Sequence, residues 1–147
     1  MLKSQLIGMK RGLQMQKIVI DTNVVISSFI SSKGIPAKII ALPALNEEFI
    51  ICYNADILAE YKDVLTRAKF DKYNFNPIDI ANFIEKVKEI GILIEPPVSD
   101  ISLPDESDRV FYDTAKFAEA LLITGNIKHY PSEDFIITPS IFLQLLN

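Results

Sequence analysis

The sequence predicts one α/β domain whose central sheet is mainly parallel and has about five strands. Two observations support this fold class. Ile18, Val19 and Ile20 form a continuous apolar run, which is typical of a strand buried on both faces in a parallel sheet. Segments with strand patterns then alternate with segments of helical pattern along the rest of the chain.

The first half of the chain follows this alternation closely. The apolar segment 24–30 is predicted to be a helix that ends at a Ser- and Gly-containing break. Pro36 suits the first turn of a second helix. Residues 47–53 have strand character, and Asn54 is an N-cap candidate for a helix from Ala55 to about Arg67.

The second half begins with a polar and aromatic linker at 69–77. Pro77 opens a helix to about Ile90, and Gly91 stops it. The remaining predicted elements are a strand at 91–95, a helix at 108–120, strands at 121–125 and 135–138, and a closing helix at 139–146.

Length and composition fit a globular protein. The 147 residues suffice for one domain with a substantial core, and 49% are hydrophobic against 23% charged. The net charge of −4 argues against a protein that coats nucleic acid through bulk positive charge. This net charge is compatible with a nuclease, because acidic side chains that bind metal cations also make a protein acidic. The single cysteine, Cys52, lies in an apolar run and is expected to be a buried, inert thiol in a reducing cytoplasm.

Residues 1–15 are expected to be an N-terminal extension, either a disordered arm or a product of an upstream start codon, with the working domain at 16–147. The extension carries Lys3, Lys10 and Arg11 but no acid, and it makes a poor signal peptide. No apolar run is long enough to cross a bilayer, so we expect no membrane association.

Acidic residues stand at several predicted strand ends and helix starts. Asp21 follows the first strand, where ligands bind in open parallel sheets, and is either an N-cap or a metal ligand. Glu60 falls at the border of its helix's apolar stripe, and the strand before it brings the helix towards the same edge. Asp108 lies in the first turn of its helix, where the dipole favours a carboxylate in any case; Asp105 and Glu106 compete for that role.

Other polar residues accompany these acids. Thr124 and Asn126 end the fourth strand much as Asp21 and Asn23 end the first, although Gly125 and Asn126 also suit a simple turn. Asp113 lies on the same helix as Asp108 but well round from it. His129 is expected to be a surface-loop residue.

Carboxylates that converge on one edge would either acquire raised pKa values or bind a cation. Oxygen ligands of this kind select Mg²⁺ or Mn²⁺ over Zn²⁺. Such an ion orients a water, aids its deprotonation and stabilises charge on a phosphoryl oxygen. Neither a catalytic histidine nor a catalytic cysteine is then required.

Four segments in this order resemble the PIN domain, and more closely the bacterial PIN-like proteins described as toxins of type II toxin–antitoxin pairs. They are 19–23, 57–61 around Glu60, 105–115 and 122–126, and the closing 137–139 also resembles the family. The resemblance extends from about Lys17 to the C-terminus. It implies a three-layer α/β/α fold and a metal-dependent endoribonuclease that hydrolyses RNA phosphodiester bonds.

The resemblance also implies particular site residues. It places the family's catalytic acids at Asp21, Glu60 and Asp108, which together with Asn126 would hold Mg²⁺ or Mn²⁺. Asn126 stands where the family has a fourth acid, so it keeps an oxygen ligand but loses a charge and would hold the metal less tightly. The supporting residues would be Asn23, Asp113 and Thr124.

The implied partners are an RNA substrate and a cognate antitoxin protein, with a homodimer as one option. Several basic side chains are candidates for phosphate contacts: Lys33, Lys38, Lys62, Arg67, Lys69 and Lys72. The aromatic segment 70–75 is then a dimer surface, an antitoxin surface or a lid.

Two alternatives stay open. The first is a PIN-fold binding module that is inactive or weakly active because of Asn126. The second is another acid-edged phosphate enzyme, but a haloacid-dehalogenase-type phosphatase needs an aspartate where Asn23 stands, and the residues of a receiver domain are not evident.

Overall fold

The computed structural model describes residues 15–146, so the predicted N-terminal extension lies outside the described residues apart from Met15. A five-stranded, all-parallel sheet in the order β3-β2-β1-β4-β5 confirms the predicted fold class. Its strands are β1 (Gln16–Ile20), β2 (Phe49–Tyr53), β3 (Ile92–Leu93), β4 (Leu121–Ile123) and β5 (Ile136–Ile137).

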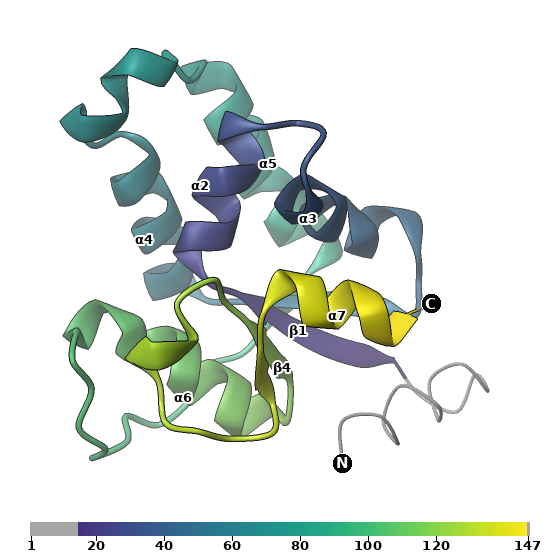
Figure 1. The fold of residues 1–147 in the computed structure, drawn as a ribbon, viewed down its shortest axis with the longest axis vertical. Helices are drawn as coiled ribbons and strands as arrows, with labels where there is room; N and C mark the ends of the chain where they lie inside the picture. Colours follow the sequence, from purple (N-terminus) through teal and green to yellow (C-terminus); the bar gives the residue numbers. More distant parts are fainter. Residues whose placement is uncertain (1–14, 147) are drawn as a thin grey trace.

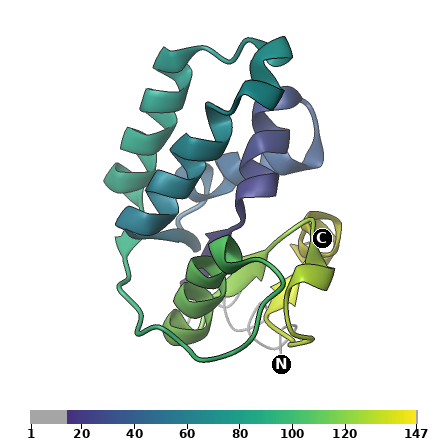
Figure 2. The same cartoon turned by 90° about the vertical axis from the view of Figure 1, so that its left-hand side faces the viewer.

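Helices flank the sheet. Figure 1 shows α6 on one side of it and α2 to α5 on the other, and Figure 2 shows α4 and α5 side by side. The α-helices are α2 (Thr22–Ile30), α3 (Ile35–Leu45), α4 (Ala55–Leu65), α5 (Pro77–Ile90), α6 (Arg109–Ala118) and α7 (Pro139–Leu146). Three 3₁₀ turns, η1 (Ala68–Tyr73), η2 (Glu106–Asp108) and η3 (Ile127–His129), connect them.

Most predicted elements are confirmed, and the differences lie at their ends. The helix α5 has the predicted bounds, whereas β3 is shorter than the predicted strand because it pairs with β2 only at Cys52 and Tyr53. The predicted linker at 69–77 contains η1. The helix predicted from Asp108 to Ala120 is observed as α6 (Arg109–Ala118), because Asp108 belongs to η2 and the helix ends before Glu119, whose φ is 55°.

The predicted N-cap of α4 is confirmed. The side-chain oxygen of Asn54 accepts a hydrogen bond from the Ile57 backbone N–H at 2.9 Å. Its amide nitrogen donates to the Ile94 carbonyl at 2.9 Å and to Thr114 Oγ1 at 3.0 Å. Asn54 therefore joins the end of β2 to the segment after β3 and to α6.

The core is centred on β1, whose residues Ile18, Val19 and Ile20 are fully buried. Tyr61 from α4 is also fully buried and donates its hydroxyl to the Ile20 carbonyl at 2.5 Å. Burial raises the pKa of the Cys52 thiol to about 12, which confirms the prediction of an inert cysteine.

The strand order creates a switch point between β1 and β4. The chain leaves β1 towards β2 on one side, while β4 and β5 extend the sheet on the other. In open α/β sheets, ligands bind at such a point, beyond the carboxyl ends of the strands. Among residues 15–146 no single helix is long and apolar enough to cross a membrane; α2 and α3 reach that length only as a pair bent by 104°.

Candidate functional site

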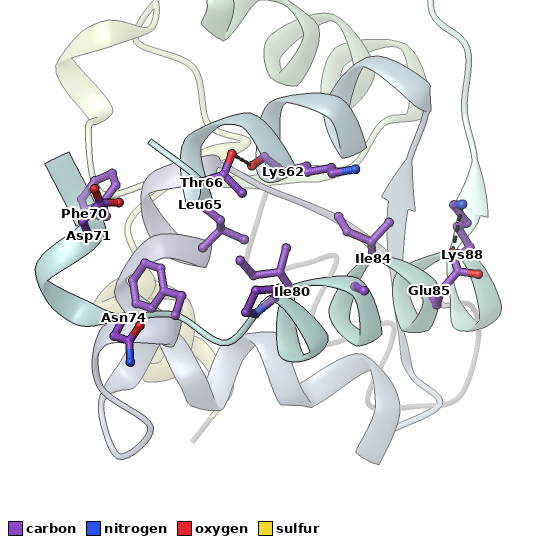
Figure 3. Close-up of a pocket in the computed structure, with 13 residues that line it drawn as sticks. Lys62, Leu65, Thr66, Phe70, Asp71, Asn74, Ile80, Ile84, Glu85 and Lys88 are labelled. Atoms are coloured by element: carbon purple, nitrogen blue, oxygen red, sulfur yellow. Dashed lines mark hydrogen bonds and ion pairs between the residues drawn. The ribbon is translucent and has the colours of Figure 1, made fainter. Parts of the chain in front are cut away.

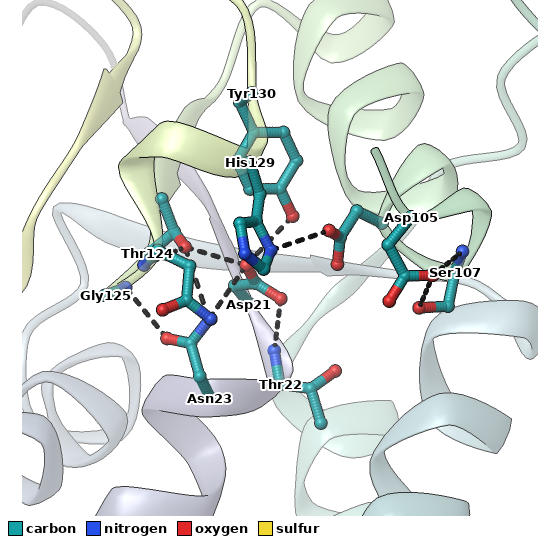
Figure 4. Close-up of polar contacts among 11 residues, drawn as sticks. Asp21, Thr22, Asn23, Asp105, Ser107, Thr124, Gly125, His129 and Tyr130 are labelled. Carbon is teal, nitrogen blue, oxygen red and sulfur yellow. Dashed lines mark hydrogen bonds and ion pairs between the residues drawn. The ribbon is translucent and has the colours of Figure 1, made fainter. Parts of the chain in front are cut away.

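Asp21 lies at the switch point and is almost completely buried, with 3% of its surface exposed. Its Oδ2 accepts hydrogen bonds from Thr124 Oγ1 at 2.7 Å, the Tyr130 hydroxyl at 2.9 Å and Asn23 Nδ2 at 3.1 Å (Figure 4). Its Oδ1 accepts one hydrogen bond, from the Thr22 backbone N–H at 2.7 Å. The N-cap interpretation of Asp21 is therefore confirmed, and Oδ1 has acceptor capacity left for a further partner.

Two opposing effects act on the pKa of Asp21. Burial is the larger and raises the pKa, whereas the hydrogen bonds from Thr124, Tyr130 and others lower it. Burial and the neighbouring charge of Asp21 also raise the pKa of Tyr130, so its hydroxyl keeps its proton and donates. The carboxylate is thus held in one orientation by fixed donors.

Asn23 and Thr124 connect the ends of β1 and β4. Asn23 Oδ1 accepts from the Gly125 backbone N–H at 2.8 Å, and its Nδ2 donates to Thr124 Oγ1 at 3.3 Å. A Cβ at Gly125 would lie only 3.0 Å from Asn23 Oδ1, so this close approach favours glycine. The structure therefore brings the predicted supporting residues Asn23 and Thr124 against Asp21.

Asn126 follows the same turn but is exposed. Its backbone N–H donates to Thr124 Oγ1 at 3.0 Å. Asn126 is therefore joined to Thr124 through its backbone, and it is the residue at which the family resemblance places a fourth acid.

Three neighbouring acids before α6 have separate roles. Asp105 caps η2 by accepting from the Ser107 backbone N–H at 2.9 Å. Glu106 pairs with Arg109, whose Nε lies 2.6 Å from its Oε2. Asp108 makes no capping bond, and its Oδ2 lies 3.3 Å from His129 Nδ1.

The pKa of Asp108 depends on burial and on the other acids of the site. Burial and then the charges of Asp21 and Asp105 raise the pKa of Asp108 to about 6, while His129 opposes the rise. The Asp108 side chain is only 14% exposed. Asp21 and Asp108, although distant in the sequence, therefore share one electrostatic environment.

Glu60 approaches from α4. Its Oε1 lies 3.8 Å from Arg67 Nη2, and its side chain is 23% exposed. Burial raises the pKa of Glu60 and Arg67 lowers it, while the charges of Asp63, then Asp105 and Asp21, add to the rise. The pKa of the second predicted acid therefore depends weakly on the charge of the first.

A cleft of about 720 Å³ between α4 and α6 is lined by Glu60 and Asp113, whereas Asp21 and Asp108 do not line it. Asp113 Oδ2 accepts from the Ser99 backbone N–H at 3.1 Å. Its buried Oδ1 has no partner among the described residues. Asp113 therefore supports the loop before α6 and does not join the cluster around Asp21.

A divalent cation requires several oxygen ligands around one point. Within residues 15–146, no three or more Asp, Glu, His or Cys side chains gather closely enough to hold one ion, so Asp21, Glu60 and Asp108 are not assembled around one point. Mg²⁺, however, is usually held by one or two carboxylates together with several waters. Asp21 and Asp108, each with lone pairs left over, fit such a hydrated site.

Two residues of the site were not identified from the sequence. His129 is exposed on η3, as expected of a surface histidine, but it also contacts Asp108. Tyr130 was not singled out, although its hydroxyl binds Asp21. No local pattern indicates either contact, because both depend on how the β4–β5 connection folds back over the switch point.

Comparison with known proteins agrees with this architecture. The model of the PIN domain family matches residues 17–128. An uncharacterized protein of Methanocaldococcus jannaschii is 35% identical over 111 residues, which cover 75% of this chain and 70% of that protein. No solved structure matches the chain. On the family match, the relative and the site geometry, the chain belongs to the PIN domain family.

Proposed function

We propose that the protein is a metal-dependent endoribonuclease that hydrolyses RNA phosphodiester bonds with Mg²⁺ or Mn²⁺. The observation that carries this proposal is the buried Asp21 at the β1–β4 switch point, whose carboxylate is held by Thr124, Tyr130 and Asn23. The charge of Asp21 also contributes to raising the pKa of Asp108, the second carboxylate of the proposed site. Two carboxylates that repel each other in a confined site are stabilised by a divalent cation. Membership of the PIN domain family supports the same assignment.

The chain's own residues have distinct roles in this proposal. Asp21 and Asp108 hold the ion, and Thr124, Tyr130 and Asn23 fix the orientation of Asp21. When bound, the ion activates a water and neutralises charge on the scissile phosphate. Rigid orientation matters because a misplaced ligand shifts the attacking water away from the phosphorus.

In this proposal Glu60 and Asn126 assist Asp21 and Asp108. Glu60 would add negative charge from α4, where its carboxylate lies 3.8 Å from Arg67. Asn126 contributes a neutral oxygen from the β4 side, so the metal is bound less tightly than by an all-carboxylate set.

Cleavage of a labelled RNA tests the proposal. We expect cleavage with Mn²⁺, none with EDTA, and a fall to background in Asp21→Asn. Asp134→Asn is the matched control, because Asp134 is exposed in a loop. Cleavage that persists both in EDTA and in Asp21→Asn would refute the assignment.

We further propose that this nuclease is the toxin of a toxin–antitoxin pair and acts in the cytoplasm. This role rests on the likeness of the segments around Asp21, Glu60, Asp108 and Asn126 to PIN toxins. Inducible expression in a bacterial host should arrest growth, and Asp21→Asn should not. Rescue by a small protein encoded beside the gene would identify the antitoxin, whereas unimpaired growth would contradict the toxin role.

A binding module without catalysis is the second candidate. It is favoured by the neutral Asn126 and by the absence, among residues 15–146, of three acids around one point. Asn126→Asp distinguishes the two functions. A nuclease should gain activity at low Mn²⁺, whereas a binding module should gain metal affinity without any cleavage.

A further inference from the structure

A hollow of about 800 Å³ lies away from the acidic site, between the C-terminal end of α4, η1 and α5 (Figure 3). Its apolar lining is formed mainly by Leu65, Phe70, Phe75, Ile80 and Ile84. Its polar lining residues are Lys62, Thr66, Asp71, Asn74, Glu85 and Lys88. An apolar lining with polar groups beside it suits a flat, partly polar ligand.

Aromatic rings line and extend this hollow. Tyr73 and Phe75 are stacked, with ring centroids 5.7 Å apart and an interplanar angle of 9°. Phe70 lies 6.4 Å from both rings. Tyr73 is 40% exposed, so part of its surface is open to an incoming planar group.

Three lysines around the hollow have no acidic partner among the described residues. Lys62, Lys69 and Lys72 form no ion pair with any described acidic side chain, whereas Lys88 pairs with Glu85 at 3.0 Å. Lys69 Nζ lies 5.1 Å from the Phe70 ring centroid, and Lys72 Nζ lies 5.1 Å from that of Tyr73. Asp71 and Glu85 also line the hollow, but Glu85 is paired with Lys88. Among the described residues, three unpaired lysines and one unpaired acid therefore lie around the hollow, and this balance favours an anionic ligand.

The hollow is connected to the acidic site by α4. Arg67, two residues beyond the last residue of that helix, lies 3.8 Å from Glu60, one of the acids predicted for the site. From Glu60 to its last residue, Leu65, the helix rises by about 8 Å. One polynucleotide strand can therefore span both places.

We propose that this hollow binds a nucleobase of single-stranded RNA, with the aromatic rings stacking on the base and the lysines contacting the adjacent phosphates. The proposal rests on the proposed function for the identity of its polymer. Interleaved aromatic and basic side chains are the usual means of binding unpaired strands, because every base offers a π face and every linkage a charge. A base already stacked in a duplex cannot enter, so the site selects single strands.

Fluorescence anisotropy of a fluorescein-labelled oligouridylate, measured in EDTA, tests this site without cleavage. We expect Tyr73→Ala to weaken binding by about 5- to 150-fold, and Tyr73→Phe to retain it. Lys69→Gln should reduce the slope of log K against log salt by about 0.7. Phe117→Ala is the matched control, since Phe117 is 58% exposed on α6, and duplex RNA should compete poorly.

The outcomes separate this site from the nuclease proposal. Because binding is measured in EDTA, loss of binding in Tyr73→Ala supports the site even where no cleavage is seen. Equal binding by Tyr73→Ala and wild type would overturn it. A change of sedimentation mass in Tyr73→Ala would identify the surface as a contact between protein chains and would also overturn it.

Discussion

Replacing Asp108 with asparagine is expected to stabilise the fold at neutral pH while abolishing the proposed nuclease activity. Burial and the charges of Asp21 and Asp105 raise the pKa of Asp108 from its ordinary value of 3.8 to about 6. A carboxyl whose pKa is higher in the folded state contributes stability below its unfolded pKa, and this contribution is lost as the pH rises through the folded value. Above pH 6 the ionised Asp108 is therefore unfavourable, and the neutral asparagine is not.

The size of the effect follows from the shift. A rise of about two pKa units corresponds to at most about 3 kcal/mol. The Asp108 side chain is 14% exposed at the mouth of the site, where solvent screens the charge, and His129 partly compensates it. We therefore expect a gain of about 1 kcal/mol, or a rise in Tm of about 3 °C for a domain of this size.

Urea unfolding followed by circular dichroism in EDTA measures this effect at pH 8 and at pH 4. Asp108→Asn should be more stable than wild type at pH 8, and the difference should shrink towards pH 4 because both side chains are then neutral. Asp134→Asn should show no such dependence. A destabilised Asp108→Asn at pH 8, or a difference that does not vary with pH, would refute the reasoning.

Three further predictions concern stability and are read from the urea midpoint. Asn54→Ala removes the α4 cap and two buried hydrogen bonds, and should cost about 2 kcal/mol. Gly91→Ala should cost about 1–3 kcal/mol, because its Cβ would lie 2.6 Å from the Val87 carbonyl oxygen; an unchanged midpoint would contradict this contact. Tyr61→Phe leaves the buried Ile20 carbonyl without its side-chain donor and should cost about 1–3 kcal/mol, whereas no loss would mean that the bond contributes little.

Which elements form was largely predictable, because local periodicity and end signals decide them. Pro77 and Gly91 delimit α5, and Asn54 caps α4, as the sequence indicates. The short strand β3 was overestimated, since an edge strand extends only as far as its single neighbour pairs with it. Such lengths depend on register between distant segments, which no local pattern contains.

The candidate site was predictable only in part. Asp21 and Thr124 were recognised because each directly follows a strand of the sheet. Their partner Tyr130 was not, since its contact depends on the path of the β4–β5 connection. The assembly of Asp21, Glu60 and Asp108 around one ion stays a prediction for metal-binding experiments.

The sequence by itself determined an alternating α/β chain with acids at the carboxyl edge of its sheet, because hydrophobic period and capping chemistry act between near neighbours. Only the tertiary structure decided that Asp105 and Glu106 bind local partners while Asp108 remains available beside Asp21. The physical reason is that three carboxylates within one turn have similar local chemistry. How far each of these carboxylates lies from Asp21, and how deeply each is buried, is decided only when the chain folds.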